Sequence, residues 1–108
     1  MSQPPLPGGG VPLTLDRART LRLDFNALCA LRKETGQNPL SPEFWADFDD
    51  VLKLRATLWA ALIHEDPSLT VAQVGAVIDM TRLAEIANAL ATAVSAAMPS
   101  KKLHEVSS

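Results

Sequence analysis

Residues 50–65 read DVLKLRATLWAALIHE and carry the strongest helical pattern of the chain. Their large apolar residues recur at spacings of three and four and widen into a broad stripe: Val51, Leu52, Leu54, Leu58, Trp59, Leu62 and Ile63. A stripe of that width predicts a helix that packs against more than one neighbour. Asp66 and Pro67 end the pattern, because proline disfavours helix at the residue before it.

Upstream of this helix, the apolar residues first alternate and then change to helical spacing. Residues 11–15 and 20–24 alternate apolar and polar side chains around a four-residue turn, which predicts a β-hairpin. Pro12 restricts the first strand to a sheet edge, because proline has no N–H group. From Phe25 the spacing predicts a helix that is capped by Asp24 or Asn26 and ends at Gly36. Ser41 before Pro42 predicts a further helix start.

Downstream, residues 70–73 read TVAQ and form a capping box, in which Gln73 can reach back to the amide of Thr70. Asp79 or Thr81 is expected to cap the last helix. Its apolar residues recur at spacings of three and four and extend to the end of the pattern: Leu83, Ile86, Ala87, Leu90, Val94 and Met98. The other faces of this helix are mostly alanine, which has the best helix propensity.

The ends of the chain differ in composition from its middle. Residues 1–10 hold three prolines and the triplet Gly8-Gly9-Gly10, so they predict a flexible arm. Residues 99–108 are mostly small and polar and predict a flexible tail. The remaining residues, 11–98, predict one mainly α-helical domain, with a short N-terminal β-hairpin packed on a small bundle of four to five helices.

Composition excludes several classes of protein. The 108 residues carry a formal charge of −2, without the basic surplus typical of a nucleic-acid-binding domain. One cysteine cannot form an internal disulfide. No apolar run approaches the roughly 20 residues that span a bilayer, and the first residues lack the pattern of a secretory signal. These features favour a soluble protein in a reducing, intracellular compartment.

The residues that could carry chemistry do not form a recognisable catalytic pattern. His64 lacks the second histidine of a zinc-protease helix, since Ser68 stands four residues on. The acidic residues at 47, 49 and 50 lack the glycine of a calcium loop and are expected to be solvated. Cys29 is interpreted as a buried structural thiol. We therefore expect no enzyme activity, no metal and no cofactor.

The aromatic side chains have two readings. Trp59 lies on the apolar stripe and is expected in the core. Trp45, beside Phe44 and Phe48, resembles the aromatic anchor of a protein interface.

The order of these segments resembles the tail assembly chaperones of long-tailed phages, prophages and gene transfer agents. The resemblance covers residues 11–98 and depends on three blocks: LRLDFNAL at 21–28, LRATLWAALIHEDP at 54–67 and LTVAQVG at 69–75. This sequence departs from the family in its longer proline–glycine arm and in Arg32 and Lys33, where relatives are often acidic.

The resemblance implies a protein that coats the tape measure protein and keeps it soluble in the bacterial host cytoplasm, and that is absent from the mature particle. The implied partners are the tape measure protein, further copies of the chain, a longer form made by ribosomal frameshifting, and the tail tube protein. Neither nucleic acid nor a membrane is expected as a partner. We expect contacts to client or self from exposed edges of helical residues and from an alanine face: Trp59, Leu62, Ile63, Ala89, Ala93 and Ala97, with Trp45 as a further anchor.

Two alternatives stay open at this point. The chain could be a structural tail component, such as a completion or tube-associated protein. It could also be a small helical regulatory or nucleic-acid-binding protein, because Arg17, Arg19 and Arg22 cluster near the predicted hairpin and could contact phosphates.

Overall fold

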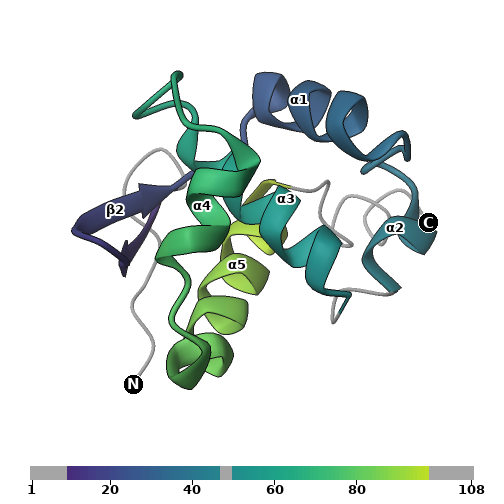
Figure 1. Ribbon diagram of the computed structural model, residues 1–108. Helices are drawn as coiled ribbons and strands as arrows, with labels where there is room; N and C mark the ends of the chain where they lie inside the picture. The colour runs from purple at the N-terminus through teal and green to yellow at the C-terminus, as the bar shows by residue number, and fades with distance from the viewer. Residues whose placement is uncertain (1–9, 47–49, 98–108) are drawn as a thin grey trace.

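The computed structural model describes residues 10–46 and 50–97, which form a β-hairpin and a set of helices (Figure 1). The elements in chain order are β1 (Val11–Thr14), β2 (Ala18–Leu21), α1 (Phe25–Thr35), α2 (Pro42–Ala46), α3 (Val51–Leu62), α4 (Val71–Val77), the 3-10 turn η1 (Met80–Arg82) and α5 (Leu83–Ala97). The predicted fold class, a short hairpin on a small helical bundle, is confirmed. The predicted arm and tail, except Gly10, lie outside the described residues, as do Asp47, Phe48, Asp49 and Met98.

The two strands pair antiparallel, with Val11 opposite Leu21 and Pro12 opposite Thr20. Pro12 is tolerated because the main-chain groups of its partner Thr20 point away from β1, so the missing N–H of the proline costs no ladder bond. The second strand begins two residues earlier than predicted, because Ala18 and Arg19 pair with β1 instead of forming the turn.

The outer edge of β2 is covered by the end of α3 and the residues that follow it. The Thr20 amide donates to the Glu65 carboxylate over 3.1 Å, and the His64 Nε2 lies 2.7 Å from the Thr20 carbonyl oxygen. The amide of Arg22 donates to the Ala61 carbonyl at 3.0 Å. These contacts satisfy a strand edge that would otherwise remain open to pairing with another chain. His64 and Glu65 therefore have a structural role here.

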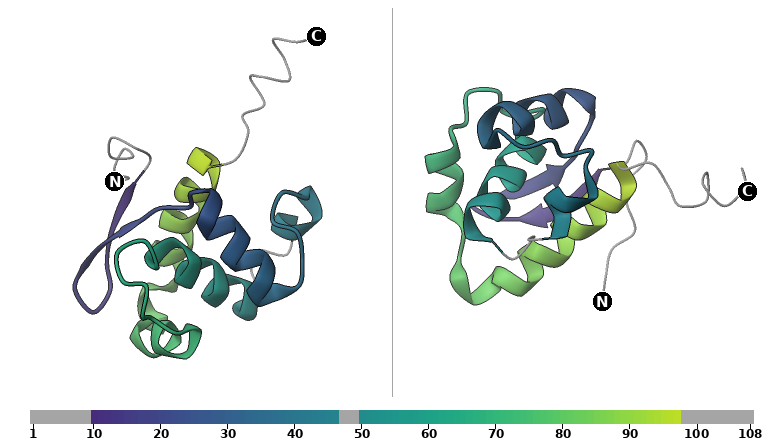
Figure 2. Two further views of the ribbon diagram at one scale, coloured as in Figure 1. Left: turned by 90° about the horizontal axis from the view of Figure 1, so that it is seen from above. Right: turned by 90° about the vertical axis from the view of Figure 1, so that its right-hand side faces the viewer.

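Helix α3 lies at the centre of the molecule and contacts α1, α4, α5 and β2 (Figures 1 and 2). Leu58, Ala60 and Ala61 have no exposed surface, and Leu54 is 7% exposed. The predicted burial of this helix against several neighbours is confirmed. The first turn of α3 is an exception: Val51 and Leu52 belong to the predicted stripe but are 70% and 63% exposed, because no described element covers them.

Local capping signals fix where the helices begin and end. The Asp24 carboxylate caps α1 by accepting from the Ala27 amide at 2.8 Å, and Gly36 ends the helix in the left-handed conformation at φ 73°. Asp50 caps α3 by accepting from the Leu52 amide. Asp79, one of the two predicted caps, accepts from the Thr81 amide at the start of η1. The predicted start and end of α1 and the predicted start of α4 agree with the structure.

The short helix α2 is held to α3 through a buried lysine. Lys53 is 9% exposed; its Nζ donates to the Phe44 carbonyl oxygen over 2.9 Å and lies 4.9 Å from the centroid of the Phe44 ring. The Phe44 ring is itself buried and meets Trp45 edge-on. A lysine on the inner side of α3 therefore combines a charge-assisted hydrogen bond with a cation–π contact.

Cys29 is exposed on α1, so the prediction of a buried thiol is wrong. The buried residues of α1 are Ala27, Leu28 and Leu31, which face α3, and Cys29 follows Leu28 on the outer side. No helix in the described part of the chain is long and apolar enough to cross a membrane.

Candidate functional site

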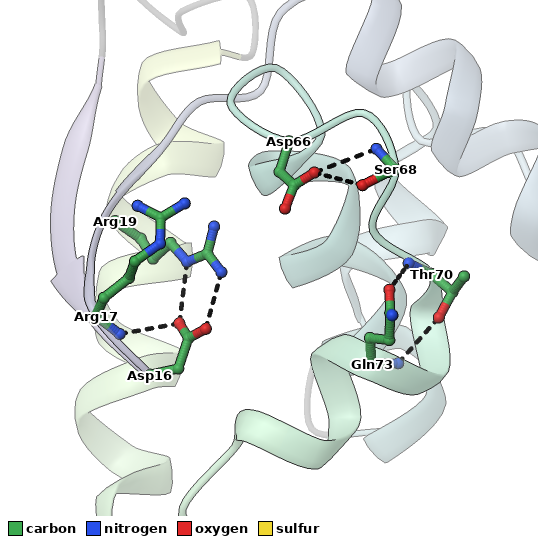
Figure 3. Close-up of polar contacts among 7 residues, drawn as sticks. All are labelled: Asp16, Arg17, Arg19, Asp66, Ser68, Thr70 and Gln73. Atoms are coloured by element: carbon green, nitrogen blue, oxygen red, sulfur yellow. Dashed lines mark hydrogen bonds and ion pairs between the residues drawn. The ribbon is translucent and has the colours of Figure 1, made fainter.

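A groove of about 360 Å³ lies between the hairpin turn, the end of α3 and helix α4. Its apolar walls come from α3, α4 and the loop between them, and its polar groups come from the hairpin, that loop and α4. The lining residues are Asp16, Arg19, Leu62, Asp66, Leu69, Gln73, Val74, Ala76 and Val77. Figure 3 shows the polar residues around this groove.

Arg19 is the unusual residue of this groove, because it occupies an inward position of β2. Its neighbours on that face, Leu21 and the paired Leu13, are buried apolar residues, and the Arg19 side chain is only 5% exposed. Asp16 compensates the charge: the Nε and Nη2 of Arg19 donate to its two carboxylate oxygens, each at 3.0 Å. The hydrogen bond from Arg19 lowers the pKa of Asp16 below its ordinary value.

The third guanidinium nitrogen of Arg19, Nη1, is buried and has no hydrogen-bond partner among the described residues. Figure 3 shows the guanidinium turned from the hairpin into the space between Asp16 and Asp66. The hydrogen bond with Asp16, supported by the negative charges of Asp16, Glu65 and Asp66, raises the pKa of Arg19 above its ordinary value. The groove therefore contains a permanent cation, and the two N–H groups on its Nη1 donate no hydrogen bond to the described residues.

The loop between α3 and α4 forms a second side of the groove. The Asp66 Oδ1 accepts from the amide and the hydroxyl of Ser68, at 3.3 and 2.7 Å, which fixes a tight turn after α3. Asp66 Oδ2 accepts no hydrogen bond from the residues that the structure describes. The indole N–H of Trp59 donates to the Leu69 carbonyl oxygen over 2.9 Å and so holds Leu69 in the wall.

Helix α4 forms the remaining wall, and its position depends on a capping box. The Thr70 amide donates to the Gln73 side chain at 2.9 Å, and the Thr70 hydroxyl accepts from the Gln73 amide at 3.1 Å, as predicted (Figure 3). Gly75 lets α4 approach α3 closely, because a Cβ atom there would lie 2.9 Å from the Arg55 Cδ. Val74, one residue before, is fully buried.

The groove provides apolar and polar binding groups. Its described lining holds no cysteine, histidine or serine, so it lacks a nucleophile with an adjacent base. No group of three or more metal-ligating side chains occurs within residues 10–46 and 50–97. The arrangement offers apolar contact, N–H donors and one carboxylate oxygen, which together suit a polypeptide or small amide.

The residues predicted to make protein contacts lie at different depths. Leu62 is 1% exposed, so the expectation of an exposed edge at Leu62 is wrong; the residue instead lies beneath the groove. Ala93 is also 1% exposed, and Ala89 and Ala97 pack against the core, so the predicted alanine face points inward. Ile63 is half-buried at the end of α3.

The surface of α5 that does face solvent consists of Glu85 and of other, smaller residues. The smaller residues recur at spacings of three and four, with Ala96 next to the last of them: Ala84, Asn88, Ala91, Ser95 and Ala96. The sequence could not separate these two faces, because both are rich in alanine and only the position of the neighbouring strands and α3 decides which one is covered.

Both tryptophans are half-buried and donate their indole N–H to a main-chain oxygen. Trp45 donates to Pro39 over 2.7 Å, and Trp59 to Leu69. Trp59 packs against the core, as expected for a residue on the stripe. Each indole therefore binds the main chain of a neighbouring loop, at Pro39 or at Leu69, while part of the ring stays exposed.

Arg19 is the site residue that sequence reasoning missed, since it was assigned to the turn. The signal was present, because Arg19, Leu21 and Leu23 follow a spacing of two on one side of the strand. The predicted arginine cluster does not act as a set of available cations: Arg19 is buried in its ion pair with Asp16, whereas Arg17 and Arg22 are exposed.

No protein-family model matches the chain, and neither a curated protein nor a solved structure is significantly similar to it.

Proposed function

We propose that this protein is a tail assembly chaperone, which coats the tape measure protein of a long-tailed phage or phage-like particle and keeps it soluble during assembly. A tape measure protein is a long helical polymer, and its apolar stripes would aggregate if they were left uncovered. A small helical domain can cover them by laying the client in a groove or against an exposed face.

The observation that carries this proposal is the apolar surface that the domain leaves uncovered. Five large apolar side chains in the described part of the chain are more than half exposed: Phe25, Leu40, Val51, Leu52 and Met80. Val51 and Leu52 adjoin each other on the first turn of α3 and are 70% and 63% exposed. Covering such surface on association is favourable by about 25 cal/mol for each Å² of apolar area.

The outward face of α5 supports the proposal in a second way. Apart from Glu85 in its first turn, which pairs with Arg82, its exposed residues between Ala84 and Ala96 have short side chains. Two helices can approach more closely when the side chains at the contact are small. This face therefore has room for a client helix or for another copy of the chain.

The experiment is co-expression with a candidate tape measure protein, followed by measurement of the client in the soluble fraction. We expect the client to be soluble with the wild-type chain and largely insoluble without it. Leu52→Glu should lower the soluble fraction severalfold, because it places a charge in an exposed apolar surface. Ala72→Glu introduces the same charge at an exposed position of α4 and should leave client solubility near that of the wild type.

Two results would contradict the proposal. One is a client that is equally insoluble with and without the chain. The other is the presence of the chain in fixed number in purified particles, which would indicate a structural tail component.

A further inference from the structure

We propose that the groove between the hairpin turn and α4 is a docking pocket for an uncharged apolar side chain of a partner polypeptide, held through the main-chain amides beside that side chain. That this partner is the tape measure protein rests on the proposed function. The pocket itself rests only on the residues that line the groove.

The first argument is the unused N–H pair of Arg19. A buried donor without a partner is costly, and natural proteins rarely leave one unless a ligand or ion completes it. Nη1 belongs to a side chain that is 5% exposed and lines the groove. Because Nη1 itself has almost no exposed surface, a carbonyl oxygen that enters from the groove would accept from it after a small movement of the groove wall, while Nε and Nη2 stay bonded to Asp16.

The second argument is the arrangement of the remaining groups. Asp66 Oδ2 can accept an N–H, and the side-chain amide nitrogen of Gln73 can donate, because that side chain uses only its oxygen in the capping box. A peptide unit presents one N–H donor and one carbonyl acceptor, which matches this set. Between these polar groups lie Leu69 and Val77, which provide apolar contact for a side chain.

The third argument is charge, which selects a neutral occupant. Asp16 and Asp66 line the groove and would repel a carboxylate. A lysine or arginine head group would be repelled by Arg19 and attracted by Asp66, but it would lose its hydration against the apolar side chains of Leu69 and Val77, which disfavours it. The volume of about 360 Å³ is at the lower end of the range of ligand pockets, roughly 300–1,000 Å³, and suits an anchor residue better than a whole helix.

The test is an NMR titration of the full chain with the blocked peptide acetyl-Ala-Leu-Ala-amide. We expect amide shifts at Leu69, Ala76 and Val77 and a shift of the Arg19 Nε–H signal. The counterparts with Ala, Lys or Glu at the central position should bind at least about tenfold more weakly.

Two tryptophan variants of α4 form a matched pair for this titration. Ala76 is exposed at the rim and lines the groove, so Ala76→Trp should fill the pocket and weaken binding at least about tenfold. Ala72 is exposed on the same helix but does not line the groove, so Ala72→Trp should bind like the wild type.

The proposal of a docking pocket would be wrong if the leucine peptide caused no shift, or if the lysine or glutamate peptide bound more strongly than the leucine peptide. It would also be wrong if Ala76→Trp bound the leucine peptide as tightly as the wild type. Groove shifts that depend only on protein concentration would mean that a second copy of the chain occupies the groove, and would likewise contradict the proposal. Failure of the proposed function is distinct from all of these: peptide binding at the groove together with a client that stays insoluble would retain the pocket and refute the chaperone role.

Discussion

Arg19 places a charged side chain among the apolar residues of a small core. Its side chain extends from the inward face of β2, where the neighbouring residues are apolar. The ion pair with Asp16, whose carboxylate is partly exposed, makes this position tolerable because it compensates the charge of the buried guanidinium. The hydrogen bond from Arg19 is also the main reason that the pKa of Asp16 is lowered.

This pair makes the stability of the protein depend on pH. The folded state holds the pKa of Asp16 below its ordinary value of 3.8, so the contribution of Asp16 is present above that value and is lost as the pH falls through the lower, folded-state pKa. We expect Asp16→Asn to lower the melting temperature clearly at pH 7. The gap between variant and wild type should narrow near pH 3, as measured by thermal unfolding followed by circular dichroism. A gap of equal size at both pH values would contradict the role given to the pair.

At the scale of elements, the helix caps were predictable because they depend on residues within one turn of each other. Asp24 and Gly36 bound α1, and Thr70 with Gln73 begins α4, as the local sequence indicated. Helix α4 has seven residues, and a helix of this length gains little from its own propagation. Its position as a wall of the groove therefore depends on its cap and on the buried side chain of Val74.

Thr70→Ala tests this dependence on the cap. Loss of the hydroxyl that accepts from the Gln73 amide should cost about 1 kcal/mol in the free energy of unfolding and increase hydrogen exchange in α4. Chemical denaturation and amide exchange measured on the folded protein give the two quantities. Ser95→Ala, at an exposed position inside α5, is the control and should be neutral or slightly stabilising. If both variants unfolded like the wild type, the capping box would be unimportant to α4.

At the scale of the whole molecule, α3 joins all the other packed elements into one core. It contacts α1, α4, α5 and β2, and α5 in turn contacts both strands. A single core of this kind predicts one cooperative unfolding transition.

Leu58→Ala should therefore destabilise the entire domain, because Leu58 has no exposed surface and lies midway along α3. The expected loss is about 2–5 kcal/mol in the free energy of unfolding, which urea denaturation measures. Leu52→Ala on the same helix removes an exposed side chain and should change stability by less than about 0.5 kcal/mol. Similar losses for the two variants, or separate transitions for the hairpin and the helices, would contradict a single core centred on α3.

Local sequence patterns are sufficient to predict the kinds of element, their order and several of their ends. Alternation at residues 11–15, the helical spacing at 50–65 and the caps at Asp24 and Thr70 depend on contacts between residues close in the chain, so local chemistry is sufficient to predict them.

Which faces of those elements are buried depends on the packed fold and could not be predicted from local patterns. The packed fold buries Leu62 and Ala93, exposes Val51 and Cys29, and brings Arg19 of the hairpin opposite α4. The physical reason is that burial depends on which neighbour lies against a face. Residues far apart in the chain determine that neighbour, and two alanine-rich sides of one helix look the same until the core forms on one of them.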